Sequence, residues 1–279
     1  MIVNSKKLLT IAKKKKFAIP ATNFIDLDSA RTFVNVAEKR KLPLILPFAQ
    51  SHRDILSLEE AATIGKLMAN SVNVPIVLHL DHGEDFDYIA KAIELGFTSV
   101  MIDASQKSFG ENIYITKKVV ELAHSKNVTV EAELGHVGAN DTSESNEITN
   151  SIYTEAKDVI SFVEQTNVDS LAISIGTAHG IYKGKPKLNF ERLEEINSLV
   201  EIPLVLHGGS STGYDNLSRC AQSGIAKINI YSDFLKAAVD AINKGDISDY
   251  VELKNRTNIA MATVINTYFD VFMTDNYHL

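Results

Sequence analysis

Residues 74–83 read VPIVLHLDHG, a short apolar run that ends in an acid, a histidine and a glycine. An amphipathic helical pattern follows over 86–95, and the same alternation recurs outward in both directions, which is typical of parallel βαβ units. The predicted strands are 17–21, 42–48, 74–80, 99–102, 128–133, 170–175, 202–206 and 226–230. Predicted helices between them include 57–69, 86–95, 111–125, 155–166, 190–199 and 216–223. About eight such units predict an α/β fold, a single (β/α)8 TIM barrel, as one domain over residues 1–279.

Two segments lie outside this repeat. Lysines 13–16 follow apolar residues, and we predict a short amphipathic helix whose apolar side covers one end of the barrel. Residues 140–150 are polar and predict a long loop inside the domain.

Composition and charge exclude several classes of protein. The chain has 279 residues, 45% of them hydrophobic, and a formal net charge of −7. This charge does not favour nucleic acid or an anionic membrane as a partner. No apolar run approaches the ~20 residues of a membrane helix. The single cysteine, Cys220, cannot form an internal disulfide or a Cys-rich metal site. We therefore expect a cytoplasmic protein.

Reactive residues gather after the predicted strands, where the active sites of such barrels lie. Three strand ends carry a histidine, and these are His82, His179 and His207. Three neutral imidazoles at one barrel mouth form a catalytic zinc site with an open fourth position. His136 is the main alternative ligand. His79 is three residues before His82, so regular alternation points them to opposite sheet faces, and we interpret His79 as a packing residue.

Acids and glycines complete this predicted mouth. Asp81 at the rim suits proton transfer, whereas Asp103 and Glu133 either orient the histidines or act directly. The loops after the last two strands often bind phosphate in such barrels, because glycines let backbone N–H groups approach the anion. The residues predicted to serve this purpose are Gly208, Gly209, Ser210 and Ser232, with Lys183 adding a positive charge.

Six motifs together resemble the class II ketose-bisphosphate aldolases over nearly the whole chain. They are LHLDHG (78–83), VMIDAS (100–105), EAELG (131–135), AHGIYKG (178–184), LHGGS (206–210) and KINIYSD (227–233). The resemblance implies that His82, His179 and His207 hold Zn²⁺, and that Asp103 and Glu133 belong to an alternative metal site. It further implies a bound monovalent cation, Na⁺ or K⁺.

The same resemblance implies the activity, a reversible aldol cleavage of a phosphorylated ketose. Asp81 would handle the proton on the C4 hydroxyl, and a loop carboxylate would protonate the enediolate. Fructose 1,6-bisphosphate is the leading substrate, which would give dihydroxyacetone phosphate and glyceraldehyde 3-phosphate. Tagatose 1,6-bisphosphate and a singly phosphorylated ketose are the alternatives. Residues expected to contact the substrate are Asn23, Gly180, Lys183, Gly208, Gly209, Ser210, Asn229 and Ser232.

The chain departs from the family pattern in several places. The family's loop glutamate is replaced by Asp141, and Glu144 or Glu147 could serve instead. Ala49 replaces a serine after the second strand, and HGGSG reads His-Gly-Gly-Ser-Ser. Arg256 is the nearest match to the arginine that binds the phosphate of the aldehyde.

Three other interpretations stay open at the level of sequence. A Schiff-base aldolase would use Lys227, which has the parity of Asn229 and is predicted to point inward. A metal-dependent hydrolase would share the fold, and a catalytically silent protein would bind a sugar phosphate without turnover. A homodimer or homotetramer is expected from the family resemblance.

Overall fold

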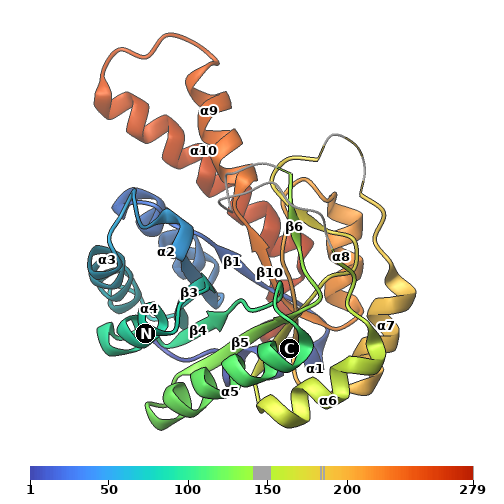
Figure 1. The fold of residues 1–279 in the computed structure, drawn as a ribbon. Coiled ribbons are helices and arrows are strands. Elements are labelled where there is room, and N and C mark those ends of the chain that lie inside the picture. Colours follow the sequence, from blue (N-terminus) through green and yellow to red (C-terminus); the bar gives the residue numbers. More distant parts are fainter. Residues whose placement is uncertain (141–151, 183, 185, 279) are drawn as a thin grey trace.

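The computed structural model describes residues 1–140, 152–182, 184 and 186–278, and a closed barrel of parallel strands forms its centre (Figure 1). The strands follow one another around the barrel in the order β1-β10-β9-β7-β5-β4-β3-β2. Their bounds are β1 Ile19–Thr22, β2 Leu44–Ala49, β3 Ile76–Gly83, β4 Ser99–Ile102, β5 Thr129–Leu134, β7 Ser170–Ile173, β9 Leu204–Leu206 and β10 Ile225–Ile230. These eight parallel strands with helices between them confirm the predicted (β/α)8 barrel.

Helices surround the barrel and begin at strong local signals. Ser57 and Ser108 each form a capping box with a glutamate three residues later, which satisfies backbone N–H groups at the helix start. The helices around the strands are α2 Leu27–Arg40, α3 Leu58–Asn70, α4 Phe86–Leu95, α5 Phe109–Ser125, α6 Ala156–Thr166, α7 Phe190–Leu199 and α8 Tyr214–Gln222, with the 3-10 turn η1 Gln50–His52. The bounds of α4 and α7 are those predicted from the apolar periodicity.

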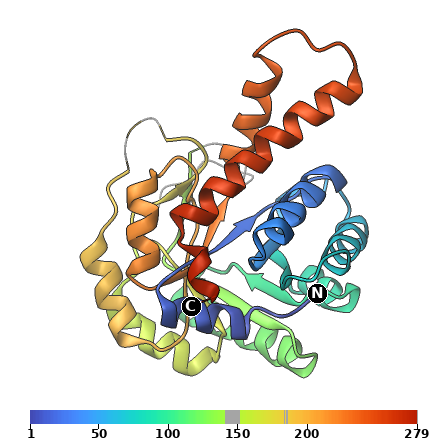
Figure 2. The ribbon, with the colours of Figure 1, turned by 180° about the vertical axis from the view of Figure 1, so that it is seen from behind.

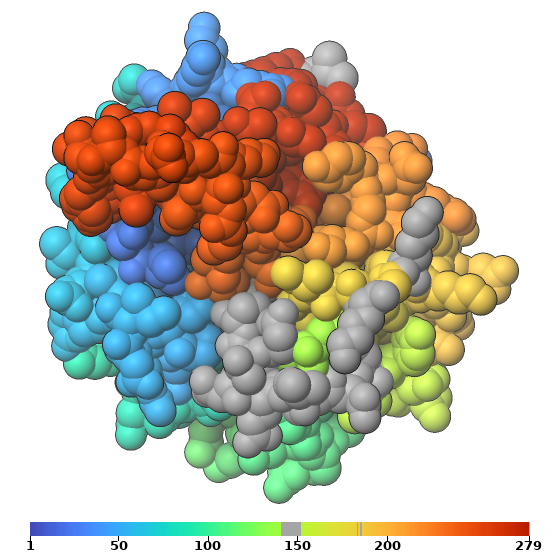
Figure 3. Space-filling model, turned by 90° about the horizontal axis from the view of Figure 1, so that it is seen from above, coloured from blue at the N-terminus to red at the C-terminus, as the bar shows by residue number. Residues whose placement is uncertain are grey.

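Two helices extend away from the barrel. Helix α9 (Ser232–Ile242) and helix α10 (Tyr250–Val271) form a hairpin that projects beyond the rest of the fold in both ribbon views (Figures 1 and 2). The base of α10 buries Ile265, Tyr268 and Phe269 before the chain ends in the turn η2 (Thr274–His278). Seen from above, the orange and red atoms of the hairpin lie over blue atoms from the N-terminal part of the chain (Figure 3), and α10 packs against α2.

The opposite end of the barrel is closed by α1 (Lys6–Lys15), as its amphipathic pattern predicted. Leu8, Leu9 and Ala12 pack against inward residues of the barrel, among them Ile45 and Val77. This cluster is separate from the larger core, in which the outward side chains of the strands meet the surrounding helices. Catalytic groups in such barrels lie at the other, carboxyl end of the strands, away from α1.

The loops at the carboxyl ends are themselves ordered by a short sheet that the sequence did not predict. Strand β6 (Gly138–Ala139) pairs in parallel with β8 (Ala178–His179), outside the barrel. His179 therefore lies on a loop strand beyond β7 rather than at the end of a barrel strand. No helix in the described part of the chain is long and apolar enough to span a membrane.

Candidate active site

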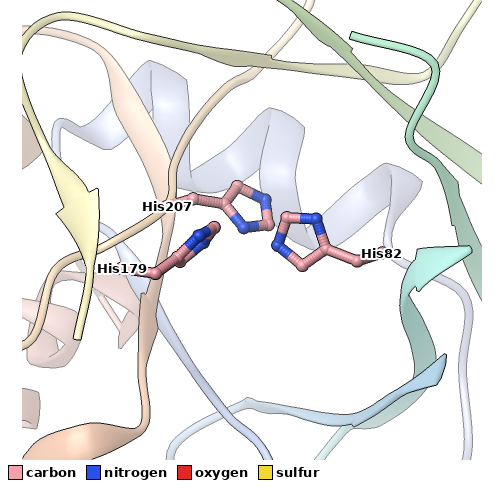
Figure 4. A group of neighbouring side chains, drawn as sticks. All are labelled: His82, His179 and His207. Carbon is pink, nitrogen blue, oxygen red and sulfur yellow. The ribbon is translucent and has the colours of Figure 1, made fainter. Parts of the chain in front are cut away.

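Three histidines, from the end of β3, from β8 and from the residue after β9, meet at the mouth of the barrel (Figure 4). The ring centroids of His82 and His207 are 4.6 Å apart, those of His82 and His179 4.9 Å, and those of His179 and His207 5.8 Å. One nitrogen from each ring lies within 4.8 Å of the other two, a spacing at which one metal ion can contact all three. The structure therefore brings together the three predicted ligands.

Carboxylates fix the orientation of two of these rings. Nδ1 of His82 donates to Oδ2 of Asp103 at 2.8 Å, and Nε2 of His207 donates to Oε1 of Glu131 at 2.9 Å. A carboxylate can only accept, so each ring must carry its proton on the bonded nitrogen. The other nitrogen of each ring, Nε2 of His82 and Nδ1 of His207, then presents a lone pair. Such carboxylate–histidine pairs are typical of metal sites.

The electrostatics of the cluster fit a bound cation. Nε2 of His82 and Nδ1 of His207 are buried and have no hydrogen-bond partner among the described residues. Burial lowers the pKa of His179 and of His207, which favours the neutral imidazoles that a metal requires. Burial also opposes protonation of His82, but Asp81 and Asp103 outweigh it and raise its pKa to about 10. A cation bound to Nε2 of His82 would take the place of that proton.

A second candidate group shares His82 and consists of His82, Asp103 and Glu133. Asp103 also accepts from the backbone N–H and hydroxyl of Ser105, at 3.1 and 2.7 Å. Burial and the nearby Asp103 raise the pKa of Glu133 to about 8. His136, the alternative ligand, belongs to neither group, and its Nδ1 lies 3.0 Å from the hydroxyl of Ser105 instead.

The backbone of β3 explains how two successive residues reach the mouth. His82 has a φ of 46°, and the pairing of β3 with β4 shifts register between Leu80 and Gly83. This irregularity breaks the alternation, so Asp81 and His82 both serve the site. The prediction that His79 and His82 point to opposite faces of the sheet is wrong, although His79 is buried as expected of a packing residue. His79 faces the barrel interior, with Nε2 4.0 Å from both Asp81 and Glu131.

Asp81 is held by two amide side chains. Nδ2 of Asn23 donates to its Oδ2 at 2.8 Å, and Nδ2 of Asn229 donates to its Oδ1 at 3.0 Å. Burial alone would raise the pKa of Asp81, but the charges of His82, His207 and Lys227 lower it below its usual range. The carboxylate is therefore ionised and fixed beside the histidines. Oδ1 of Asn229 is buried without a partner among the described residues, so it can accept from a ligand.

The predicted phosphate loops after β9 and β10 are tied to each other. The hydroxyl of Ser210 accepts from the backbone N–H groups of Tyr231 and Asp233, at 3.0 and 3.4 Å, beside the start of α9 where Ser232 lies buried. Gly208 has a φ of 65° and lies so close to the backbone of Ala178 that a side chain there would collide with it. The hydroxyl of Tyr182 accepts from the N–H of Ala178 and donates to the carbonyl of Gly208.

Other predicted residues lie elsewhere or outside the described chain. Gly180, with a φ of 84°, directly follows His179 on its loop. Arg256 lies on the projecting helix α10, where its guanidinium bonds Glu252 and the carbonyls of Gly245 and Asp246. The structure thus places Arg256 within its own hairpin. Asp141, Glu144, Glu147 and Lys183 lie outside the described residues.

A sequence model described as "Fructose-bisphosphate aldolase class-II" matches residues 3–277. The chain belongs to the class II fructose-bisphosphate aldolase family. It is therefore an aldolase, a lyase that acts on carbon–carbon bonds, and the family implies a phosphorylated sugar as substrate. Among solved structures, the YdjI aldolase from Escherichia coli K12 is similar, with a TM-score of 0.89 and 31% identity over 99% of this chain and 98% of that chain. Fructose-bisphosphate aldolase from Campylobacter jejuni shares the fold, with a TM-score of 0.82 and 23% identity over 98% of this chain and 96% of that chain.

Beneath the mouth, this aldolase has a buried ion pair that sequence reasoning missed. Nζ of Lys227 lies 2.8 and 2.9 Å from the two oxygens of Glu131, and both side chains are almost fully buried. Burial alone would raise the pKa of Glu131, but Lys227 and the bond from His207 lower it to about 2. The prediction that Lys227 points into the barrel is confirmed. Glu131 and Glu133 are two residues apart on β5, so the alternation of side chains along a strand could have predicted that both point into the barrel. The amine of Lys227 is bonded to a carboxylate, which disfavours its use as a Schiff-base nucleophile.

Proposed function

We propose that this aldolase catalyses the zinc-dependent, reversible cleavage of fructose 1,6-bisphosphate to dihydroxyacetone phosphate and glyceraldehyde 3-phosphate. One observation carries the proposal: the three histidines converge beside an ionised Asp81 that two asparagines hold in place. A metal that stabilises negative charge and a fixed base that removes a proton are the two groups that a retro-aldol reaction requires.

Zinc fits the donor set of the site. His82, His179 and His207 would hold the ion through three nitrogens and leave a fourth position open for the substrate. Asp103 and Glu133 would provide the alternative position that shares His82. When bound, the ion would supply a Lewis acid that stabilises the charge left at C3 when the C3–C4 bond breaks.

The residues of the chain would move and hold the reacting groups. Asp81 would accept the proton of the C4 hydroxyl as the aldehyde leaves, and Asn23 would keep that carboxylate aimed at the substrate. Asn229 would donate a hydrogen bond from Nδ2 to Asp81 and accept one from a substrate hydroxyl at Oδ1. Asp141 remains our prediction for the second acid, with Glu144 and Glu147 as the alternatives.

The phosphate of the dihydroxyacetone half would lie between the loops after β9 and β10. Gly208, Gly209, Ser210 and Ser232 would surround it at the start of α9, where backbone N–H groups favour an anion. Gly180 would also contact the phosphate, and so would Lys183, which lies outside the described residues; a Na⁺ or K⁺ ion nearby remains a prediction. The position of Arg256 within the α9–α10 hairpin is a reason to test singly phosphorylated ketoses beside the bisphosphates.

We further infer a homodimer or homotetramer. The projecting hairpin exposes Val239, Tyr250, Val251 and Ile259, each more than half exposed. Apolar side chains at this density on a projecting element are typical of a surface that packs against another subunit. Light scattering coupled to size exclusion would determine the assembly, and a monomer at micromolar concentration would contradict this inference.

The deciding experiment is aldol cleavage by the purified protein. Fructose and tagatose 1,6-bisphosphates and a singly phosphorylated ketose would be offered with and without a chelator, with release of dihydroxyacetone phosphate as the readout. We expect cleavage that a chelator abolishes and zinc restores, and none in a His207→Ala variant. Zinc binding without turnover of any ketose would contradict the proposed activity and leave a sugar-phosphate binding protein.

A further inference from the structure

The ion pair between Lys227 and Glu131 lies inside the barrel, on β10 and β5, just below the histidines. Lys227 is 1% exposed and Glu131 is 2% exposed. Removing two charges from water is costly, and replacing such a pair by apolar residues of similar size is often neutral or stabilising. Stability alone therefore does not account for this pair, and its contacts indicate what else it does.

The directions of the hydrogen bonds around the pair are fixed by chemistry. An ammonium group can only donate and a carboxylate can only accept. Two N–H groups of Lys227 point to the oxygens of Glu131, and its Nζ lies 3.3 Å from Nε2 of His79. Nε2 of His79 must accept, so its Nδ1–H donates to the hydroxyl of Ser99 at 2.8 Å. All three donors of Lys227 are thereby used inside the barrel.

The same logic determines the state of His207. Oε1 of Glu131 lies 2.9 Å from Nε2 of His207, so that nitrogen must carry the proton. Nδ1 is then unprotonated and points into the three-histidine group, buried and without a hydrogen-bond partner among the described residues. Without an acceptor at Nε2, the proton could occupy either nitrogen, and one of the two tautomers could not bind a metal.

We propose that Glu131 is a positioning residue that selects the metal-binding tautomer of His207, with Lys227 as the counter-ion that holds Glu131 in place. This inference rests on the proposed role of His207 as a metal ligand. Neither residue is a catalytic residue in this account, because both act through His207.

Two double variants with the same net charge separate this role from a structural one. Glu131→Met with Lys227→Met removes both charges and leaves Nε2 of His207 without an acceptor. Glu131→Gln with Lys227→Met also removes both charges, but the amide oxygen can still accept from Nε2 because no ammonium competes for it. A Ser99→Ala variant controls for any loss of a buried hydrogen bond in the same layer, since Ser99 bonds His79 and not His207.

The measurements are zinc affinity, by competition with a chromophoric chelator, and the ¹⁵N chemical shifts of the His207 ring in the metal-free protein. We expect the double Met variant to bind zinc about 10–100-fold more weakly and to show both tautomers, because loss of an outer partner typically has that effect. The Gln–Met variant and Ser99→Ala should stay close to wild type in both measurements. Circular dichroism would establish that each variant is folded.

The outcomes distinguish this proposal from the proposed function. If the double Met variant is folded, binds zinc like wild type and keeps a single His207 tautomer, the positioning role is overturned. Equal weakening in both double variants would also overturn it, because a structural role alone predicts that result. If wild type binds no zinc, or His207→Ala does not weaken binding, the metal site fails, and the ¹⁵N comparison still decides whether Glu131 sets the tautomer.

Discussion

Replacing Gly208 by alanine should disturb both the fold and the proposed metal site, because this glycine allows two histidine-bearing segments to lie in close contact. Gly208 follows His207, and its φ of 65° is a conformation that L side chains rarely adopt. A Cβ at this position would lie 2.5 Å from the carbonyl oxygen of Ala178 and 2.6 Å from its carbonyl carbon. Ala178 precedes His179, so these two segments cannot move apart without moving a proposed metal ligand.

The expected magnitude has two parts. The left-handed conformation costs an alanine about 1–2 kcal/mol, and the forced shift of packed backbone costs about 1–3 kcal/mol more. The Gly208→Ala variant should therefore lose about 2–5 kcal/mol of unfolding free energy. Its zinc affinity should also fall, since His179 and His207 must move apart.

Gly96→Ala is the matched control. Gly96 is also left-handed, at φ 96° and ψ 23°, but an added Cβ would meet only the flexible side chain of Lys66 at 3.4 Å. The Gly96→Ala variant should lose only about 1–2 kcal/mol of unfolding free energy and keep the zinc affinity of wild type. Urea unfolding of the metal-free proteins and zinc competition would test both variants. Equal losses of stability, with unchanged zinc affinity in both, would refute the argument.

Three further predictions concern single side chains. Asp81→Asn should lower the rate of ketose cleavage by about 10²–10⁴-fold, because the general base is lost. The zinc content, measured by elemental analysis, should stay at the wild-type level, and retained turnover would contradict the role of Asp81 as a base. Tyr268→Phe removes the hydrogen bond that the Tyr268 hydroxyl donates to Asp233. The unfolding free energy should fall by about 1.5–3 kcal/mol in urea titrations. An unchanged unfolding midpoint would show that this hydrogen bond does not stabilise the fold. Burial raises the pKa of Cys220 to about 12, so Ellman's reagent should not react at pH 8 until the protein unfolds. Because the unfolded thiol ionises near pH 8.5, the stability of wild type relative to Cys220→Ala should fall as pH rises from about 8.5 towards 12.

The sequence predicted the barrel well because each strand is a short buried run with its own helix. The window 86–95 coincides with α4, since its apolar residues repeat at helical spacing between Asp85, which caps the helix, and Gly96, which ends it. The α9–α10 hairpin was not predicted. Helix α10 buries Ile265 and Phe269 near its C-terminal end but exposes Val251 and Ile259 in the part that projects beyond the barrel, and the local sequence does not report where along the helix the packing begins.

Within the site, the sequence predicted which residues meet but not how they are held. His82, His179 and His207 were recognisable because each follows a predicted strand within a few residues. The β6–β8 pairing that carries His179 is two residues long on each strand, too short for a periodic signal. The register shift in β3 defeats the alternation rule on which the interpretation of His79 rested. The bonds from Asn23 and Asn229 to Asp81 join residues far apart in the chain, and no local pattern reports such contacts.

Strand β3 shows in three alternate residues that the barrel interior changes character along its axis. Val77 packs in the apolar cluster under α1, His79 contacts the buried ion pair, and Asp81 reaches the mouth. Such a gradient divides two requirements, stability and substrate binding, between the two ends of one barrel. Substitutions at the open end can alter which sugar is accepted while the closed end keeps the chain folded, so a descendant can acquire a new substrate without first acquiring a new scaffold.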